Sequence, residues 1–245
     1  IDALSPSLRS HARLVALLGQ RVTIAEIDGL VRKLGHTSGA LELPLDAKIA
    51  VQRLARAGVL ALDDEGGVTF RRAFVRDAIV RSVPEAVRRS VHLAAAQLHA
   101  EPPDGGAAEH QLAQLAWHAA EAGLADEAAR AYFVLAQRAL ARHAYTEAER
   151  LYSRALAQDA RPSVLDRRAA YRGRGTMRYR IGRPHDALAD LGAARAVAAD
   201  EGDVVAVIEI LLDEATALDW MDAYRASEER VVEAHALFAS IPASM

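Results

Sequence analysis

A repeated pattern of small and large apolar residues in the second half of the chain decides its fold. Residues 145–156 read YTEAERLYSRAL, residues 184–195 read PHDALADLGAAR, and residues 224–235 read YRASEERVVEAH. In each stretch a small residue is followed four positions later by a larger apolar residue and three positions after that by alanine. The first two of these positions are Ala148/Tyr152, Ala187/Leu191 and Ser227/Val231. The stretches recur every 39 or 40 residues, so we predict a helical repeat in which each unit is one helix pair.

A second small residue supports this repeat. It lies twelve positions before the first small residue of each stretch, at Ala136, Gly175 and Ala215. A small residue there would let paired helices approach closely. A hairpin of this kind cannot bury its own apolar stripe and must stack on its neighbours. We therefore expect antiparallel helices near 108–122, 125–142, 145–158, 165–181, 184–199, 203–220 and 224–239.

The first hundred residues read differently, as three helices and a β-hairpin. Ser5-Pro6 opens the first helix, Thr23 with Glu26 three residues later forms a capping box for the second, and Asp46 begins the third. Two short β segments then flank the acidic turn 63–67. This is the arrangement of a winged helix, and helices at 71–82 and 85–100 follow it.

The domain boundary is expected at residues 102–106, which read Pro-Pro-Asp-Gly-Gly and give the one strong linker signal in the chain. The fold class that we predict is mainly α: a winged-helix module with trailing helices at 1–100, followed by a superhelix of antiparallel helix pairs at 107–245.

Composition excludes several classes of protein. The 245 residues include no cysteine, which rules out disulfides, cysteine-ligated zinc, iron–sulfur clusters and a cysteine nucleophile, and fits a reducing, cytoplasmic location. No apolar run approaches the length of a transmembrane helix, so we expect no membrane partner. The net charge of −3 excludes a uniformly basic nucleic-acid binder.

The spacing of small and aromatic residues resembles tetratricopeptide repeats, with slightly longer helices than usual. Residues 70–79, FRRAFVRDAI, followed by 83–89, VPEAVRR, and by His92, resemble the end of the winged-helix module in STAND-type ATPases. That segment reads roughly F-R-H-A-L-x-R-x-A-x-Y, then L-P, then R-R-x-x-H. Such modules lie between an AAA-like ATPase domain and a tetratricopeptide array, in large LuxR-type bacterial regulators and in kinase–ATPase–repeat fusions.

The resemblance implies a nucleotide contact for Arg72, whereas ATP hydrolysis by this chain alone is not expected. The family often has histidine where this chain has Arg72, and a winged-helix histidine of related ATPases approaches the nucleotide phosphates. Arg72 would make that contact in the full-length protein, since guanidinium binds phosphate well. No Gly-x-x-x-x-Gly-Lys-Ser/Thr occurs in the chain, so ATP or ADP would belong to an upstream ATPase domain, and this chain should bind no cofactor of its own.

Other catalytic and metal signatures are missing from the sequence. His92 and His99 are seven residues apart and His110 and His118 eight apart, and neither spacing matches the H-E-x-x-H pattern that places two imidazoles one turn apart. No Gly-x-Ser-x-Gly elbow occurs either. We therefore expect no metal site and no enzymatic activity.

A DNA-binding interpretation rests on the third helix, where Lys48, Arg53 and Arg56 would face a major groove. The acidic hairpin turn 63–65 counts against it, because a DNA-binding wing approaches phosphates. The runner-up function is accordingly a transcriptional regulator that reads DNA with the winged helix.

Charge is strongly segregated in the repeat region. Residues 161–183 carry a net charge of +7 and residues 184–245 a net charge of −10. Within the basic stretch, the positions expected to face a concave groove are Arg172, Thr176, Tyr179 and Arg180. They would bind an acidic peptide or a carboxylate terminus. The alternative is that neighbouring arginines pair internally with the acidic helices that follow; these are Arg167, Arg168, Arg174, Arg178 and Arg183.

The last expected helix carries apolar residues that a final repeat would leave bare: Val231, Val232, Leu237 and Phe238. We expect further repeats beyond it and self-association through this end. The function expected from the whole sequence is a non-catalytic regulatory and scaffolding region of a larger signalling ATPase. Its groove would bind a protein partner or effector, and its winged helix would couple that binding to the protein's own ATPase domain.

Overall fold

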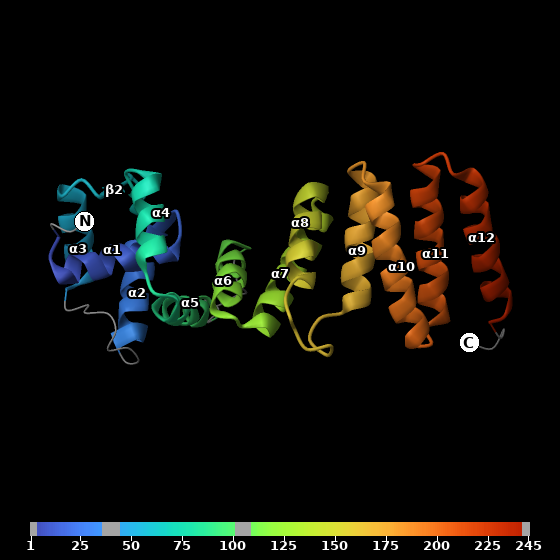
Figure 1. The fold of residues 1–245 in the computed structure, drawn as a ribbon, viewed down its shortest axis with the longest axis horizontal. Coiled ribbons are helices and arrows are strands. Elements are labelled where there is room, and N and C mark those ends of the chain that lie inside the picture. Colours follow the sequence, from blue (N-terminus) through green and yellow to red (C-terminus); the bar gives the residue numbers. More distant parts are fainter. Residues whose placement is uncertain (1–3, 36–44, 101–108, 242–245) are drawn as a thin grey trace. The chain divides into compact units, whose positions relative to one another are not determined.

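The computed structural model describes residues 4–35, 45–100 and 109–241, and these residues form twelve helices and three short strands (Figure 1). The chain divides into two compact units, Ile1–Leu124 and Ala125–Met245, and each is described by itself. The predicted fold class, mainly α with antiparallel helix pairs, is confirmed. Within the described ranges no helix is long and apolar enough to cross a membrane.

The first unit combines helices with a small sheet. Its elements are α1 (Pro6–Leu18), β1 (Arg21–Thr23), α2 (Ile24–Gly35), α3 (Ala47–Arg56), β2 (Leu60–Leu62), β3 (Gly67–Phe70), α4 (Ala73–Ser82), α5 (Glu85–Ala100) and α6 (Glu109–Ala122).

Side chains at the helix starts explain where α1, α2 and α3 begin. The Ser5 side chain accepts a hydrogen bond from the Leu8 amide, and Asp46 accepts one from Ile49. The Thr23 amide donates to the Glu26 carboxylate at 2.7 Å, and the Glu26 amide donates to the Thr23 hydroxyl at 3.2 Å, which is the expected capping box. These starts follow from local sequence alone.

The sheet contains one strand more than the sequence indicated. Its order is β1-β3-β2 with both pairs antiparallel. The hairpin β2–β3 was expected, but β1 is three residues long and only Val22 of it is buried, so it leaves no periodic signal. Its pairing with β3 is decided by packing. The assignment of this unit as a winged helix stays a prediction.

The compact units meet after Leu124. The expected linker 102–106 lies outside the described residues, and the domain boundary placed there stays a prediction. The helix after the linker, α6, packs along α5 and so belongs to the first unit.

The second unit consists of three antiparallel helix pairs. Its elements are α7 (Ala125–Ala141), α8 (Tyr145–Leu156), α9 (Arg167–Arg180), α10 (Pro184–Asp200), α11 (Val204–Asp219) and α12 (Tyr224–Ala239). In Figure 1, α9, α10, α11 and α12 run side by side in chain order. Every one of these helices matches its expected range to within two residues.

The repeat register is visible in the core and in the turns. The small residues Ala136, Gly175 and Ala215 are all buried at helix contacts. The turn inside each pair ends at a residue with positive φ: His143 (61°), Gly182 (81°) and Asp222 (56°). These positions are 39 and 40 residues apart, so the same turn geometry recurs although only one of the three residues is glycine.

Candidate functional site

Helix α9 is the most highly charged element of the second unit and contains six arginines. Asp166 caps its start by accepting a hydrogen bond from Ala169 at 2.8 Å. Two glycines give neighbours room to pack: a Cβ at Gly173 would lie 2.6 Å from Tyr152 Cζ, and one at Gly175 would lie 2.9 Å from Leu191 Cγ. Close approach therefore brings α9 against both α8 and α10.

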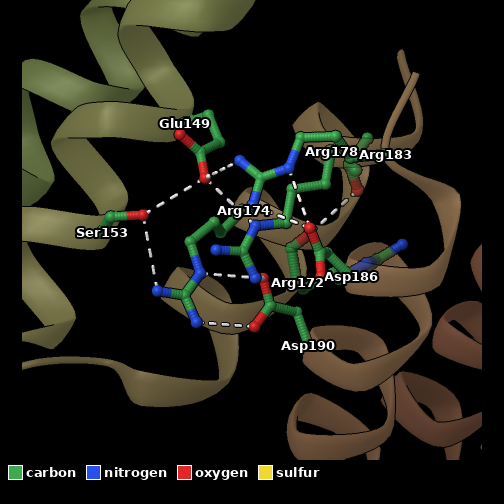
Figure 2. A network of polar contacts seen from close by, with 9 residues as sticks. Glu149, Ser153, Arg172, Arg174, Arg178, Arg183, Asp186 and Asp190 are labelled. Carbon is green, nitrogen blue, oxygen red and sulfur yellow. Dashed lines mark hydrogen bonds and ion pairs between the residues drawn. The ribbon is translucent and has the colours of Figure 1, made fainter. Parts of the chain in front are cut away.

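On the side of α9 that faces α10, arginines converge on one buried carboxylate, Asp190 (Figure 2). Arg174 binds it through two parallel bonds, Nε to Oδ2 at 2.8 Å and Nη2 to Oδ1 at 2.6 Å. Arg178 Nη1 donates to the same Oδ2 at 2.8 Å. Burial opposes the charge of Arg174, but the bonds to Asp190 outweigh it and hold its pKa above the usual range.

The same network reaches helix α8 through Glu149. Arg178 Nε and Arg183 Nη1 both donate to Glu149 Oε1, at 3.1 and 3.3 Å. Ser153, one turn later, donates to the same oxygen at 3.4 Å. Figure 2 shows these groups closing a continuous chain of contacts between α8, α9 and α10. Arg183 also pairs with Asp186 at 2.7 Å, so three arginines meet three carboxylates. This network therefore joins helices and has little charge to offer a ligand.

The opposite side of α9 faces helix α11 and carries a second set of ion pairs. Arg168 Nη1 contacts Asp203 at 2.5 Å and Glu201 at 3.1 Å. Hydrogen bonds from the Ala206 amide and from Arg168 lower the pKa of Asp203, and the bond to Asp203 raises the pKa of Arg168.

Arg172 repeats this arrangement one turn further along α9. Its Nε donates to Asp213 at 2.7 Å and its Nη1 to Glu209 at 2.5 Å. Burial opposes its charge, but the bonds to the two carboxylates raise its pKa. Along the α9–α11 seam, as we call this row of ion pairs, the guanidiniums of Arg168 and Arg172 therefore meet four carboxylates. This leaves a formal excess of two negative charges.

A cavity of about 260 Å³ lies along the same seam. Its charged lining comes from both helices, and its apolar lining comes mainly from α11. The lining residues are Asp166, Arg168, Ala169, Arg172, Asp203, Val205, Ala206, Glu209 and Ile210. The cavity combines hydrogen-bonding groups of both signs with an aliphatic wall, which suits a side chain that has an apolar stem and a polar head.

The four residues expected to form a cationic groove are not brought together as a free site. Arg172 is paired as described, and the Thr176 hydroxyl donates to the backbone oxygen of Arg172 at 2.9 Å. Tyr179 is buried in the α9–α10 core. Arg180 is exposed and stacks over Tyr145 at 5.2 Å from the ring centre. The acidic stretch after residue 184 supplies the partners of Arg172, which are Glu209 and Asp213, whereas Arg180 donates to the Tyr145 hydroxyl at 3.1 Å. Of the arginines in the alternative interpretation, Arg168, Arg174, Arg178 and Arg183 all pair with carboxylates.

In the first unit, Lys48, Arg53 and Arg56 are all exposed on α3. Gln52 and Ile49 are exposed between them, at spacings that place them on the same broad face. Asp46, the nearby acid, is engaged as the helix cap. The acidic hairpin turn is partly neutralised, because Arg21 contacts Asp63 at 2.8 Å and Glu65 at 2.9 Å.

Arg72 lies at the N-cap position of α4 and is exposed. Its side chain makes no capping bond to that helix. Its neighbours in the motif are used structurally: Arg71 Nε donates to the backbone oxygen of Leu60, and Arg76 Nε to that of Gly19.

The histidines form a buried cluster that the sequence spacing did not reveal. His92 of α5 and His118 of α6 are buried, and their Nδ1 atoms are 2.8 Å apart. His99 stacks on His118, and Trp117 lies against both His92 and His118. In the described ranges, no group of three or more histidine, aspartate or glutamate residues is arranged to hold a metal ion.

Two features of these sites were outside the reach of sequence patterns. Arg172 is held by the carboxylates of Glu209 and Asp213, which lie 37 and 41 residues further along the chain. The paired histidines, His92 and His118, are 26 residues apart. The change of net charge at residue 184 was the one sequence signal that pointed to the ion pairs of Arg172. No spacing of the histidines indicated the contact between His92 and His118.

Comparison with known proteins gives little further information. No protein-family model and no curated protein matches the chain. The crystal structure of BtubC (BKLC) from P. vanneervenii is similar over 69% of this chain and 70% of that chain, with 18% sequence identity and a TM-score of 0.46. A likeness this distant carries no argument about the site.

Proposed function

We propose that the chain is a non-catalytic regulatory and scaffolding region of a larger signal-transduction ATPase in the cytoplasm. The helix pairs of the second unit, which resemble tetratricopeptide repeats, bind a protein or peptide partner. The first unit acts as a winged helix that couples this binding to the nucleotide state of the protein's own ATPase domain. The motif at 70–92 and the element order α1-β1-α2-α3-β2-β3 support the second part of the proposal.

The observation that carries the partner-binding part is a helix face left open beside a cavity. Val205 and Leu212 of α11 are 56% and 46% exposed, and Val205 also lines the 260 Å³ cavity between α9 and α11. Exposed apolar side chains next to a lined cavity are typical of a surface that becomes covered on binding. Arg172 pairs with Glu209 and Asp213 of α11, so these side chains are already positioned before a partner binds.

In this proposal the nucleotide is bound by the ATPase domain and not by this chain. Arg72 is exposed at the start of a helix that has no acidic residue in its first turn. A guanidinium in that position is available to meet a phosphate from another domain.

Selection of peptides from a random display library on the purified chain tests the partner-binding part. We expect enriched peptides whose binding is lost in the variant Val205→Glu/Leu212→Glu, because two carboxylates would be placed in the contact. The control is Val232→Glu on α12, where a valine of similar exposure, 62%, should be dispensable. Failure to enrich any peptide, or equal loss in both variants, would refute the proposal.

DNA reading by α3 is the second candidate function, and one observation favours it. Lys48, Arg53 and Arg56 are exposed on one helix, and the described residues offer them no ion pair. A reader of DNA should bind one duplex sequence tightly at about 150 mM salt and with a steep salt dependence. That binding should be lost in Arg53→Ala and kept in Arg150→Ala, an exposed arginine of the second unit. Weak binding that is indifferent to sequence would exclude this candidate.

A further inference from the structure

One exposed face of α11 carries apolar residues and an acidic residue at helical spacing, and this pattern indicates the chemistry of a partner that would bind there. Val205, Glu209, Leu212, Thr216 and Trp220 are exposed, and they recur at three- or four-residue intervals, so they share one face of the helix. Trp220 is 62% exposed, which is unusual for the residue type that most often anchors an interface. The face is thus an apolar stripe with an acidic residue inside it.

The charge of this face is negative even after its internal ion pairs are counted. Arg172 engages Oε2 of Glu209 and Oδ2 of Asp213. In the described residues, the second oxygen of each of these two carboxylates accepts no hydrogen bond. A carboxylate has room for several donors on its two oxygens, so both groups can accept a further cation without releasing Arg172.

An anionic ligand fits the same surface poorly. It would need a free guanidinium, but Arg168 and Arg172 each already contact two carboxylates. Withdrawing either arginine would leave those carboxylates unpaired beside the incoming negative charge. The sequence pattern suggested an acidic ligand because it counted the arginines of α9 without their partners.

We propose that the α11 face and the adjoining cavity bind a basic, amphipathic peptide segment of a protein partner. Its apolar residues cover Val205, Leu212 and Trp220, and an arginine or lysine lies against Glu209 with its aliphatic stem along the cavity wall. This inference rests on the proposed partner-binding function and adds the charge of the partner to it. Charge complementarity favours this occupant over a neutral or acidic helix.

Two synthetic peptides test the inference. Both have about 15 residues, long enough to form a helix, and both carry leucines at helical spacing. One has arginine and the other glutamate at the remaining positions. Binding is measured by fluorescence anisotropy with the wild-type chain and with Glu209→Gln/Asp213→Asn. The control variant is Glu228→Gln/Glu229→Gln, which removes the same charge from exposed positions of α12.

We expect the basic peptide to bind the wild type and to bind Glu209→Gln/Asp213→Asn about tenfold more weakly, with the control unchanged. Leu212→Ser, which disturbs no ion pair, should weaken binding as well, and circular dichroism checks that each variant is folded. Equal weakening in the control would mean unspecific charge attraction and would overturn the inference. Preference for the acidic peptide would overturn it while leaving the partner-binding function intact. Absence of binding by both peptides would overturn the inference alone, because the library selection tests that function separately.

Discussion

Acidification should weaken the packing of α6 on α5, because the contact is built around neutral histidines. His118 is fully buried and His92 nearly so, and their Nδ1 atoms are 2.8 Å apart. One ring must donate a proton there and the other must accept it. If both rings were charged, two N–H groups would point at each other. Burial lowers the pKa of His118 to about 3 and that of His92 to about 4, and the charge of Arg88 adds to the effect on His92.

The sign and the size follow from proton linkage. Between the ordinary pKa of 6.5 and the lowered folded values, the unfolded chain binds more protons than the folded chain. Stability from these groups is therefore complete above about pH 6.5 and decreases as the pH falls. At about pH 5 the unfolded imidazole lies about 1.5 pH units below its pKa, which corresponds to about 2 kcal/mol per histidine. For His92 and His118 together we expect a loss of about 4 kcal/mol, before carboxylates begin to titrate.

Urea unfolding at about pH 7.5 and about pH 5, followed by tryptophan fluorescence, measures this loss. Trp117 reports on the contact, since its ring centre is 4.4 Å from that of His118, and Trp220→Phe removes the other tryptophan. In His92→Leu/His118→Leu both partners become apolar, so stability at about pH 7.5 should change little and most of the acid loss should vanish. His110→Leu, on the exposed side of α6, should keep the full acid loss.

The reasoning fails if the double leucine variant loses as much stability as the wild type over the same pH range. A second measurement does not depend on the variants. The imidazole signals of His92 and His118, followed by NMR in the wild type, should not titrate above about pH 5. Titration of either one near pH 6.5 would equally refute it.

Four further predictions concern the second unit and the whole chain. Asp190→Ala should lower the free energy of unfolding by about 3 kcal/mol, because it leaves the mostly buried Arg174 without a carboxylate and removes one of the two carboxylates of Arg178; urea unfolding measures this, and a loss below about 1 kcal/mol would contradict it. Gly173→Ala should destabilise by about 1–3 kcal/mol through its clash with a buried tyrosine ring, whereas Gly192→Ala, with nothing within 4 Å of its Cβ, should stabilise by up to about 1 kcal/mol. Replacing Leu237 and Phe238 with glutamate should reduce self-association in analytical ultracentrifugation and leave helicity unchanged, since Phe238 is 66% exposed; unfolding of this variant would show that these residues serve the fold. The chain should not hydrolyse ATP, because it has no phosphate-binding loop, and turnover that survives several columns and an empty-vector control would overturn this.

Local rules explain why the helices of the second unit could be predicted so closely. Each begins or ends at a residue whose effect reaches only a few positions along the chain. Asp166 and Asp203 cap the starts of α9 and α11, and Gly182 and Gly202 end helices in the left-handed conformation. The same locality made the capping box at Thr23 readable. Strand β1 could not be predicted from the sequence, because a three-residue strand with one buried side chain shows no detectable periodicity.

The sequence by itself determined the helices, their order and the recurrence of the helix pairs, since capping, glycine conformation and apolar periodicity all act within a few residues. Tertiary structure alone decided what the charges do. The sequence pattern suggests that Arg172 is available to a ligand, but in the structure it is bound to Asp213, 41 residues away. The ion pairs between α9 and α11, to which Arg172 belongs, retain a net negative charge. A net charge at a surface depends on which groups neutralise each other, and that is set by how helices pack across distances that no local pattern spans.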